Sequence, residues 1–199
     1  MTHALATATL VVATILCLGA TGCRLRRPDV VSVRTIEPRL LDPQFEKTRD
    51  VTKPPDASPL RLLETNSQGS MGRHVVHQQG NGELLMDPVW RWSAPPERYL
   101  DIALRLQLEE SANMRLVDSS GVPTLAATFL VWDLESKEGT QLVGAVEFQL
   151  TWTDRAVDTQ LVRDSEPVSA EKPGDLSLAA GRLLRRLAAT GLTMAISKR

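Results

Sequence analysis

The clearest local pattern in the sequence reads QLVGAVEFQLTWT from Gln141 to Thr153. Every second residue of this stretch, including Leu142, Val146 and Phe148, belongs to one series, and the residues of the other series are more polar. In an extended chain a period of two sends alternate side chains to opposite faces, so one face of this stretch can be buried. The stretch therefore predicts a long strand that lies on a hydrophobic core.

The flanking segments extend this strand into a sheet. Thr124 to Leu134 is apolar on both faces and precedes the central strand, and Ser136-Lys137-Glu138-Gly139 reads as the hairpin loop between them. A third strand is predicted for Asp158 to Glu166, after a second short connection. Strands joined by such short connections run antiparallel, so this half of the chain predicts an antiparallel meander.

Earlier in the chain, three shorter strands are predicted, at Leu60 to Glu64, Arg73 to Gln78 and Glu83 to Asp87. Gly69-Ser70-Met71-Gly72 separates the first two, and Gly80-Asn81-Gly82 separates the last two. An Asn-Gly pair between apolar runs is a strong hairpin signal, because both residues tolerate positive φ.

Two helices complete the pattern. The first begins at Pro95 and Pro96, since proline fits the first turn of a helix. The second begins after Pro173-Gly174-Asp175, where Asp175 is a good N-cap, and its apolar face runs from Leu176 to Met194. The order strands, helix, strands, helix predicts an α+β fold in which an antiparallel sheet carries two helices on one face.

The N-terminus has the features of an export signal. Ala4 to Ala20 contains no charged residue and ends in small residues before Cys23, which resembles the lipobox read by the lipoprotein-processing enzymes. Residues 1–22 are thus predicted to be a lipoprotein signal peptide, and Cys23 the first mature residue and the site of fatty acylation. Cys17 fits less well, because Leu16 precedes it.

Two other interpretations of the N-terminus remain open, an uncleaved membrane anchor and an ordinary signal peptide. The first three residues hold no Lys or Arg, whereas Arg24, Arg26 and Arg27 follow the apolar run, which opposes the positive-inside tendency. About 17 apolar residues lie at the lower limit for crossing a bilayer core of about 30 Å. All three interpretations place the domain outside the cytoplasm.

The segment after Cys23 is rich in proline, with six of the twelve prolines between Arg24 and Pro59. This composition predicts a lipid-anchored extended tether over residues 23–59 and a folded domain over residues 60–199. The β-branched run Val30-Val31-Ser32-Val33 offers an alternative, in which part of the tether adds an edge strand to the domain.

The domain holds few residues that could perform chemistry. Cys17 and Cys23 are the only cysteines, and the formal net charge of −1 gives no indication of a nucleic-acid partner. His74 and His77 are three apart on a predicted strand and point to opposite faces, so a shared metal ion is not expected. The sequence also lacks Gly-x-Ser-x-Gly and phosphate-loop motifs. We therefore expect neither enzymatic activity nor a cofactor, although an enzyme with an unrecognised site is a weaker alternative.

Several of these segments together resemble the ABC-type transport auxiliary lipoprotein family. They are Leu60-Arg61-Leu62, the stretch from Asp87 to Pro96 that reads DPVWRWSAPP, the two long strands, and the helix after Pro173-Gly174-Asp175. The resemblance covers about residues 60 to 196, and its most specific element is Arg-Trp-x-x-Pro-Pro at Arg91 to Pro96.

The resemblance implies a role beside mammalian-cell-entry proteins, which are periplasmic lipid carriers that work with an inner-membrane permease and a cytoplasmic ATPase. This chain would be the lipoprotein partner, held on the periplasmic side of a membrane by its lipid anchor, in a system that moves lipids or other hydrophobic molecules. Some family members form rings, which makes a homo-oligomer an expectation. Arg24 after the acylated cysteine favours the outer membrane under the enteric sorting rule. The alternative is a generic envelope lipoprotein that acts as a scaffold or assembly factor outside any transporter.

Trp90, Arg91 and Trp92 are the candidate partner interface. The prolines that follow them restrict the backbone, and a desolvated Trp at an interface typically contributes about 2 kcal/mol or more to binding. We expect one tryptophan to face the core and the other to face a neighbouring subunit or carrier protein. A second candidate face carries Arg182, Arg185 and Arg186 on the last helix; it is better explained as a solvated face than as a lipid-headgroup site.

Overall fold

The computed structural model describes residues 31–40, 53–68, 72–136, 139–169 and 172–196. The chain divides into two compact units, residues 1–31 and residues 32–199. The predicted signal peptide and Cys23 belong to the first unit and lie outside the described residues, so the fold below is that of the second unit.

The second unit contains nine described strands and two described helices. The strands are β1 (Arg34–Ile36), β2 (Ser58–Leu62), β3 (Asn66–Ser67), β4 (His74–Gln78), β5 (Leu84–Trp92), β6 (Met114–Leu116), β7 (Thr124–Ser136), β8 (Thr140–Thr151) and β9 (Val157–Pro167). The helices are α2 (Pro96–Glu110) and α3 (Pro173–Ile196). No described helix is both long and apolar enough to cross a membrane.

The strands β7, β8 and β9 form the predicted antiparallel meander. Along β8, Leu142, Val146, Phe148 and Leu150 are almost completely buried, which confirms the face expected from the alternating pattern. Val143 on the opposite face of β8 is buried as well. The centre of the sheet is therefore more deeply buried than the alternation alone indicates.

The sheet as a whole is mixed, and the expectation of a purely antiparallel sheet is wrong. β2, β3 and β4 each pair in parallel with β7, at successive positions along it, and β1 pairs in parallel with β5. Parallel strands need a crossover connection, and α2 supplies it between the hairpin β4–β5 and the strand β7. The hairpin itself is antiparallel, as Gly80-Asn81-Gly82 predicts.

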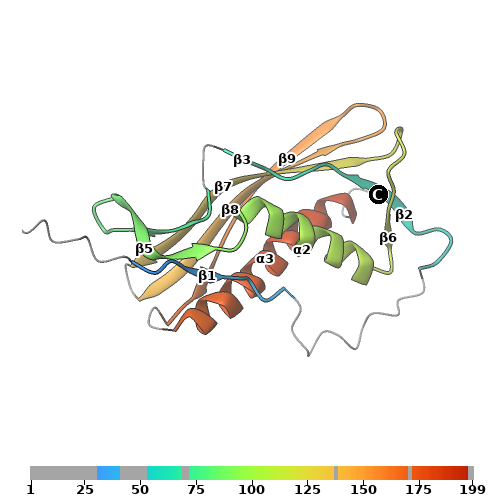
Figure 1. Ribbon diagram of the computed structural model, residues 1–199. Helices are drawn as coiled ribbons and strands as arrows, with labels where there is room; N and C mark the ends of the chain where they lie inside the picture. The colour runs from blue at the N-terminus through green and yellow to red at the C-terminus, as the bar shows by residue number, and fades with distance from the viewer. Residues whose placement is uncertain (1–30, 41–52, 69–71, 137–138, 170–171, 197–199) are drawn as a thin grey trace, which may run out of the picture. The chain divides into compact units, whose positions relative to one another are not determined.

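Both helices lie on one face of the sheet, as expected (Figure 1). α3 packs on β8 and β9, and α2 packs on α3, β6 and β7. The close approach of α3 to the sheet depends on two glycines: a Cβ on Gly144 would lie 2.9 Å from Leu187, and one on Gly191 would lie 2.5 Å from the Phe148 ring. Buried leucines and alanines of α3 fill the space between helix and sheet.

Part of the segment predicted as a tether belongs to the folded unit. β1 forms an edge strand beside β5, and Ile36 and Leu40 are buried in the core. The predicted tether over residues 23–59 is therefore wrong for residues 32–40, which belong to the folded unit. The alternative of an edge strand describes them better, although the strand begins at Arg34 instead of Val30. The reason is local: Ile36 and Leu40 supply the apolar contacts that a proline count overlooks.

Candidate functional site

An opening in the sheet lies beside the middle of β7. On one side of β7, β3 pairs as far as Phe129, and β4 begins to pair at Leu134. Residues 130–133 have no ladder partner on this side within the described chain, and β7 is irregular between Phe129 and Val131. A bulge bends its strand and turns the side chains to new directions. This part of β7 therefore lines a gap instead of a continuous sheet.

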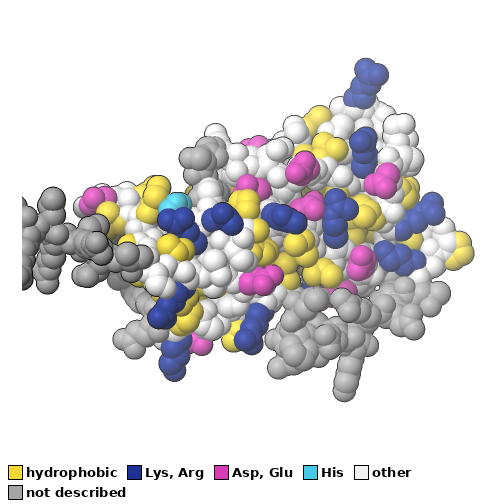
Figure 2. All heavy atoms as spheres, viewed as in Figure 1, with side chains coloured by type: hydrophobic (Ala, Val, Ile, Leu, Met, Phe, Trp, Pro, Cys, Tyr) yellow, Lys and Arg dark blue, Asp and Glu magenta, His cyan; other side chains and the backbone are white. Residues whose placement is uncertain are grey.

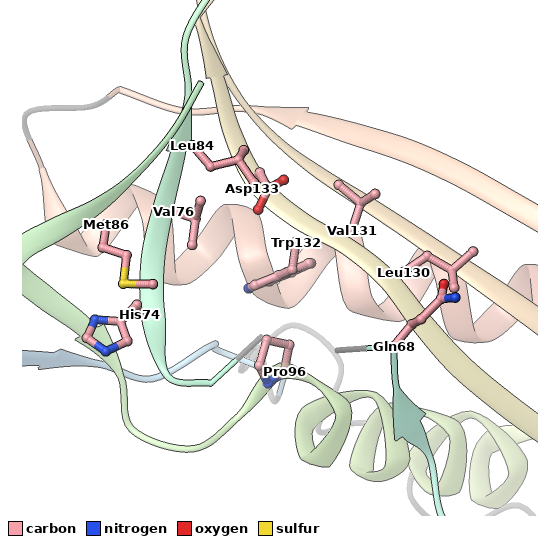
Figure 3. Close-up of a pocket in the computed structure, with 10 residues that line it drawn as sticks. All are labelled: Gln68, His74, Val76, Leu84, Met86, Pro96, Leu130, Val131, Trp132 and Asp133. Atoms are coloured by element: carbon pink, nitrogen blue, oxygen red, sulfur yellow. The ribbon is translucent and has the colours of Figure 1, made fainter. Parts of the chain in front are cut away.

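The gap is a pocket of about 280 Å³. It is lined by Gln68, His74 and Val76, Leu84 and Met86, Pro96, and Leu130, Val131, Trp132 and Asp133. In Figure 3 the side chains from β4 and β5 face those of β7 across this space, and Pro96 at the start of α2 closes its lower side. Ligand sites are commonly mostly apolar clefts with a few polar groups, and this lining has that composition.

Three of the residues that line the pocket carry polar groups with unusual environments. Trp132 is 4% exposed, and its indole nitrogen Nε1 is a buried donor with no hydrogen-bond partner among the described residues. The Nδ1 atom of His74 is also buried and has no hydrogen-bond partner among the described residues. Burial, followed by the negative charge of Glu135, raises the pKa of Asp133, although Arg163 opposes the shift. Unsatisfied buried polar atoms are uncommon in native proteins, and shifted pKa values concentrate at functional sites.

The two histidines have separate environments. His74 lines the pocket, whereas Nε2 of His77 lies 3.0 Å from the Oδ2 atom of Asp87. Burial tends to raise the pKa of Asp87, but hydrogen bonds from the backbone of Trp90, from His77 and from the backbone of Val89 lower it overall. Within the described ranges, no group of three or more His, Cys, Asp or Glu residues could hold a metal ion.

The predicted interface residues lie on β5, beside β1. Trp92 is 1% exposed and packs against Trp132, with 5.6 Å between the ring centroids. Trp90 is half-buried against the core, and the guanidinium of Arg34 lies 5.5 Å from its ring centroid. Trp92 faces the core, as expected for one of the two tryptophans. Trp90 lies two residues earlier on the same strand and also packs against the core, so the two rings share a face instead of pointing in opposite directions. Of the three predicted interface residues, only Arg91 is exposed.

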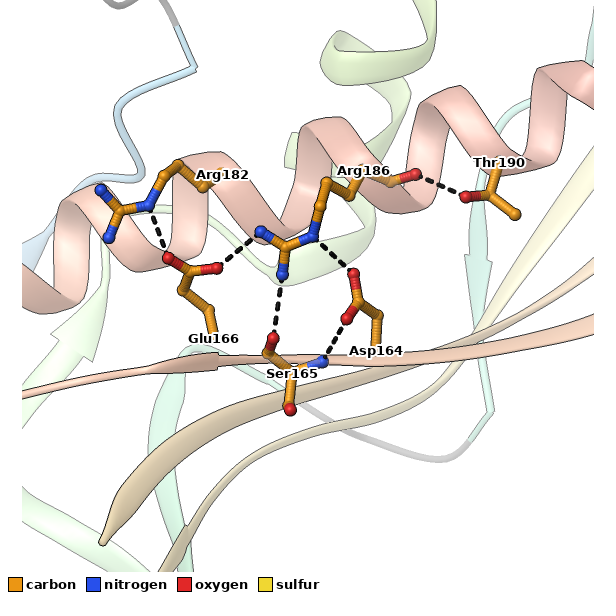
Figure 4. A network of polar contacts seen from close by, with 6 residues as sticks. All are labelled: Asp164, Ser165, Glu166, Arg182, Arg186 and Thr190. Atoms are coloured by element: carbon orange, nitrogen blue, oxygen red, sulfur yellow. Dashed lines mark hydrogen bonds and ion pairs between the residues drawn. The ribbon is translucent and has the colours of Figure 1, made fainter.

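The second candidate face, on α3, is an ion-pair network instead of a free basic surface (Figure 4). Arg186 donates to Asp164 at 2.7 Å and to Glu166 at 2.5 Å, and Arg182 donates to Glu166 at 2.6 Å. Arg185 pairs with Glu110 at the end of α2, at 2.7 Å. These carboxylates balance the arginines and join α3 to β9 and α2, which leaves little charge for a lipid headgroup.

The hairpin β4–β5 exposes several apolar side chains. Leu84 is 58% exposed and Met86 is 66% exposed, and Leu85 between them is also exposed. Figure 2 shows hydrophobic side chains on the surface around this hairpin, beside a histidine. Leu84 and Met86 also line the pocket, so the pocket opens onto an apolar surface.

Sequence reasoning missed this pocket. Its residues come from five separate segments, and the opening between β3 and β4 arises from parallel pairing that no local pattern shows. Two signals were present: the strand over Thr124 to Leu134 is apolar on both faces, and Leu84-Leu85-Met86 places three apolar residues in succession in a hairpin. Cys23, the predicted acylation site, lies outside the described residues.

No protein family model matches the chain, and no curated protein is similar to it in sequence. Solved structures share its fold. Protein XCC0632 from Xanthomonas campestris, described with the family model DUF330, has a TM-score of 0.64 at 14% identity, covering 84% of this chain and 97% of that protein. The hypothetical protein CT253 from Chlamydia trachomatis has a TM-score of 0.50 at 10% identity, covering 70% of this chain and 95% of that protein. An uncharacterized protein has a TM-score of 0.58 at 14% identity, covering 69% and 92%.

Proposed function

We propose that this chain is a lipid-anchored auxiliary component of an ABC-type transport system of the mammalian-cell-entry class, on the periplasmic side of the cell envelope. The observation that carries the proposal is the Arg-Trp-x-x-Pro-Pro element at Arg91 to Pro96, together with a lipobox that ends at Cys23. In this role the chain binds partners and performs no catalysis. Its cargo would be lipids or other hydrophobic molecules, and the anchor would lie in the outer membrane.

The position of β1 supports a domain held close to the membrane. Ten residues separate Cys23 from Arg34, the first residue of β1. A fully extended chain spans at most about 3.6 Å per residue, so this link reaches no further than about 40 Å. A domain on a tether of 37 residues could reach much further. With the shorter link, the partners would have to approach the domain near the bilayer surface.

The first prediction concerns the anchor. Replacing Cys23 by Ala should abolish acylation, because the thiol is the acceptor of the diacylglyceryl group, and the signal peptide should then stay uncleaved by the lipoprotein pathway. Metabolic labelling with a radioactive fatty acid measures the first effect, and the electrophoretic mobility of the chain measures the second. Cys17→Ala is the matched control and should remain labelled. Label on Cys23→Ala would contradict the proposed anchor.

The second prediction concerns the partner. Arg91→Glu should remove most of the mammalian-cell-entry carrier that co-purifies with the full-length chain from its native membranes, because Arg91 is the exposed member of the proposed interface. A loss of about 2 kcal/mol corresponds to roughly thirtyfold weaker binding. Arg98→Glu is the matched control, since Arg98 is exposed on α2 and lies outside the interface.

The outcome separates the two candidate functions. A carrier that is retained by the original chain and by Arg98→Glu, but lost with Arg91→Glu, supports the transport role. A chain that is acylated and yet retains no carrier under gentle cross-linking would favour an envelope scaffold outside any transporter. The oligomer size of each variant, measured in the same preparations, tests whether this element also joins copies of the chain.

A further inference from the structure

We propose that the pocket between β4, β5 and β7 binds an acyl chain that carries an uncharged oxygen acceptor, such as the carbonyl of a lipid ester. The proposal goes beyond the auxiliary transport role, because it concerns a ligand of this chain alone and holds whether or not a transporter partner exists.

The size and lining of the pocket suit an acyl chain. Val76, Leu130 and Val131 supply aliphatic wall surface, and Pro96 closes one side. A volume of about 280 Å³ has room for roughly nine groups the size of a water molecule, if each occupies about 30 Å³. A methylene group is of similar size, so the pocket accommodates a chain of medium length or part of a longer one.

The unpaired donor at the polar end of the pocket would be satisfied by a hydrogen-bond acceptor on a ligand. The indole nitrogen of Trp132 can only donate, and it is a buried donor without a partner among the described residues. In Figure 3 this nitrogen lies at the end of the ring that faces β4 and Pro96, toward the pocket. The imidazole of His74 lines the same space and can donate from Nδ1 in one tautomer. A carbonyl oxygen that accepts from Trp132 would satisfy a group that otherwise costs stability.

The charges beside the pocket select against an anion. Asp133 lines the pocket. Burial raises the pKa of Asp133, and the negative charge of Glu135 raises it further. Arg163 is engaged by Glu135, with 2.5 Å between its Nη2 and the Oε1 atom. An ionised fatty acid would place another carboxylate beside Asp133, whose charged form is already disfavoured by burial and by the charge of Glu135. An ester or alcohol avoids this repulsion.

The entrance explains how an acyl chain could arrive. Leu84 and Met86 line the pocket and are also largely exposed on the hairpin β4–β5. An acyl chain that leaves a membrane or a carrier can therefore remain in contact with apolar surface as it enters. The exposed apolar surface and the pocket are thus parts of one path.

The test uses the full-length protein in maltoside micelles and two probes, a decanoylglycerol and a decanoate that carry the same photoreactive group on the acyl chain. We expect saturable labelling by the ester, with cross-links on Val76, Met86 or residues 130–133, and at least tenfold weaker labelling by the anionic decanoate. Trp132→Phe keeps the ring and removes the donor, so the half-saturating concentration of the ester should rise about threefold to tenfold.

A second pair of variants keeps the test valid if Trp132→Phe folds poorly. Met86→Gln should reduce labelling, whereas Leu161→Gln should not, because Leu161 is an equally exposed residue (63%) on β9 that does not line the pocket. Cross-links scattered over the surface, equal labelling by both probes, or equal effects of the two Gln variants would overturn the proposal. The assay involves no carrier, so its failure and a failure of the transport role are distinguishable.

Discussion

Replacing Trp92 by Ala is expected to lower the free energy of unfolding by about 3 to 5 kcal/mol, the usual cost of removing a fully buried tryptophan. Trp92 contacts Trp132 in the core, at the point where β5 leads into α2. The truncation would leave a cavity between the sheet and the start of that helix. Since domains of this size are stable by about 5 to 15 kcal/mol, the variant should lose a large part of its stability.

Urea unfolding of the full-length chain, followed by circular dichroism, measures this effect. Trp90→Ala is the matched control, because Trp90 is two residues earlier on the same face and only half-buried. It should lose less than half as much. Trp92→Phe should also be mild, since it keeps most of the apolar volume and removes an indole nitrogen that has no partner among the described residues. Equal losses for Trp92→Ala and Trp90→Ala would show that Trp92 is not a central core residue.

The contrast between the two tryptophans shows what the sequence could predict. The period of two over Gln141 to Thr153 depends only on local backbone geometry, and β8 follows it closely. The same rule places Trp90 and Trp92 on one face, and both pack in or against the core. The proline pair after Trp92 also predicted the start of α2 correctly.

The pairing of strands could not be predicted in this way. β4 lies parallel to β7 although 56 residues of sequence lie between His77 and its partner Leu134. Hydrophobic periodicity states which face of a strand is buried, but it says nothing about which distant strand lies beside it. The pocket depends on this pairing, because it lies where β3 has ended and β4 has not yet begun to pair. Its residues were therefore visible in the sequence, but their proximity was not.

The arginines of α3 illustrate a related limit. The sequence shows Arg182, Arg185 and Arg186 on the outer side of a helix, where a solvated face is the ordinary expectation. The partners of Arg182 and Arg186 are Asp164 and Glu166 on β9, which lie opposite the helix only because β9 is the neighbour of β8. The charge pattern indicated polar surface correctly for Arg182 and Arg186, whereas the side chain of Arg185 is only 13% exposed. The ion pairs of all three arginines depend on the tertiary fold.

Replacing Gly181 by Ala is expected to destabilise the protein by about 3 kcal/mol and to release residues 37–40 from α3. Ser177, Gly181 and Arg185 are spaced four apart and form one stripe of the helix. The Ser177 carbonyl accepts a hydrogen bond from the Arg39 amide at 3.0 Å, and the Ser177 hydroxyl donates to the Glu37 carbonyl. Arg185 donates to the Leu40 carbonyl at 3.2 Å. Between these contacts, a Cβ on Gly181 would overlap the carbonyl oxygen of Arg39.

The expected loss of stability is opposite in sign to the usual effect, because Gly→Ala within a helix normally stabilises the helix by up to about 1 kcal/mol. Gly174→Ala is the control: it lies in the first turn of the same helix with no atom within 4 Å of its added Cβ, and its stability should change by less than about 0.5 kcal/mol. Urea unfolding measures both variants, and tryptic cleavage after Arg39 reports release of the segment. If Gly181→Ala cleaves no faster than Gly174→Ala and is no less stable, residues 37–40 do not pack on α3, and the segment before residue 60 returns to the role of a tether.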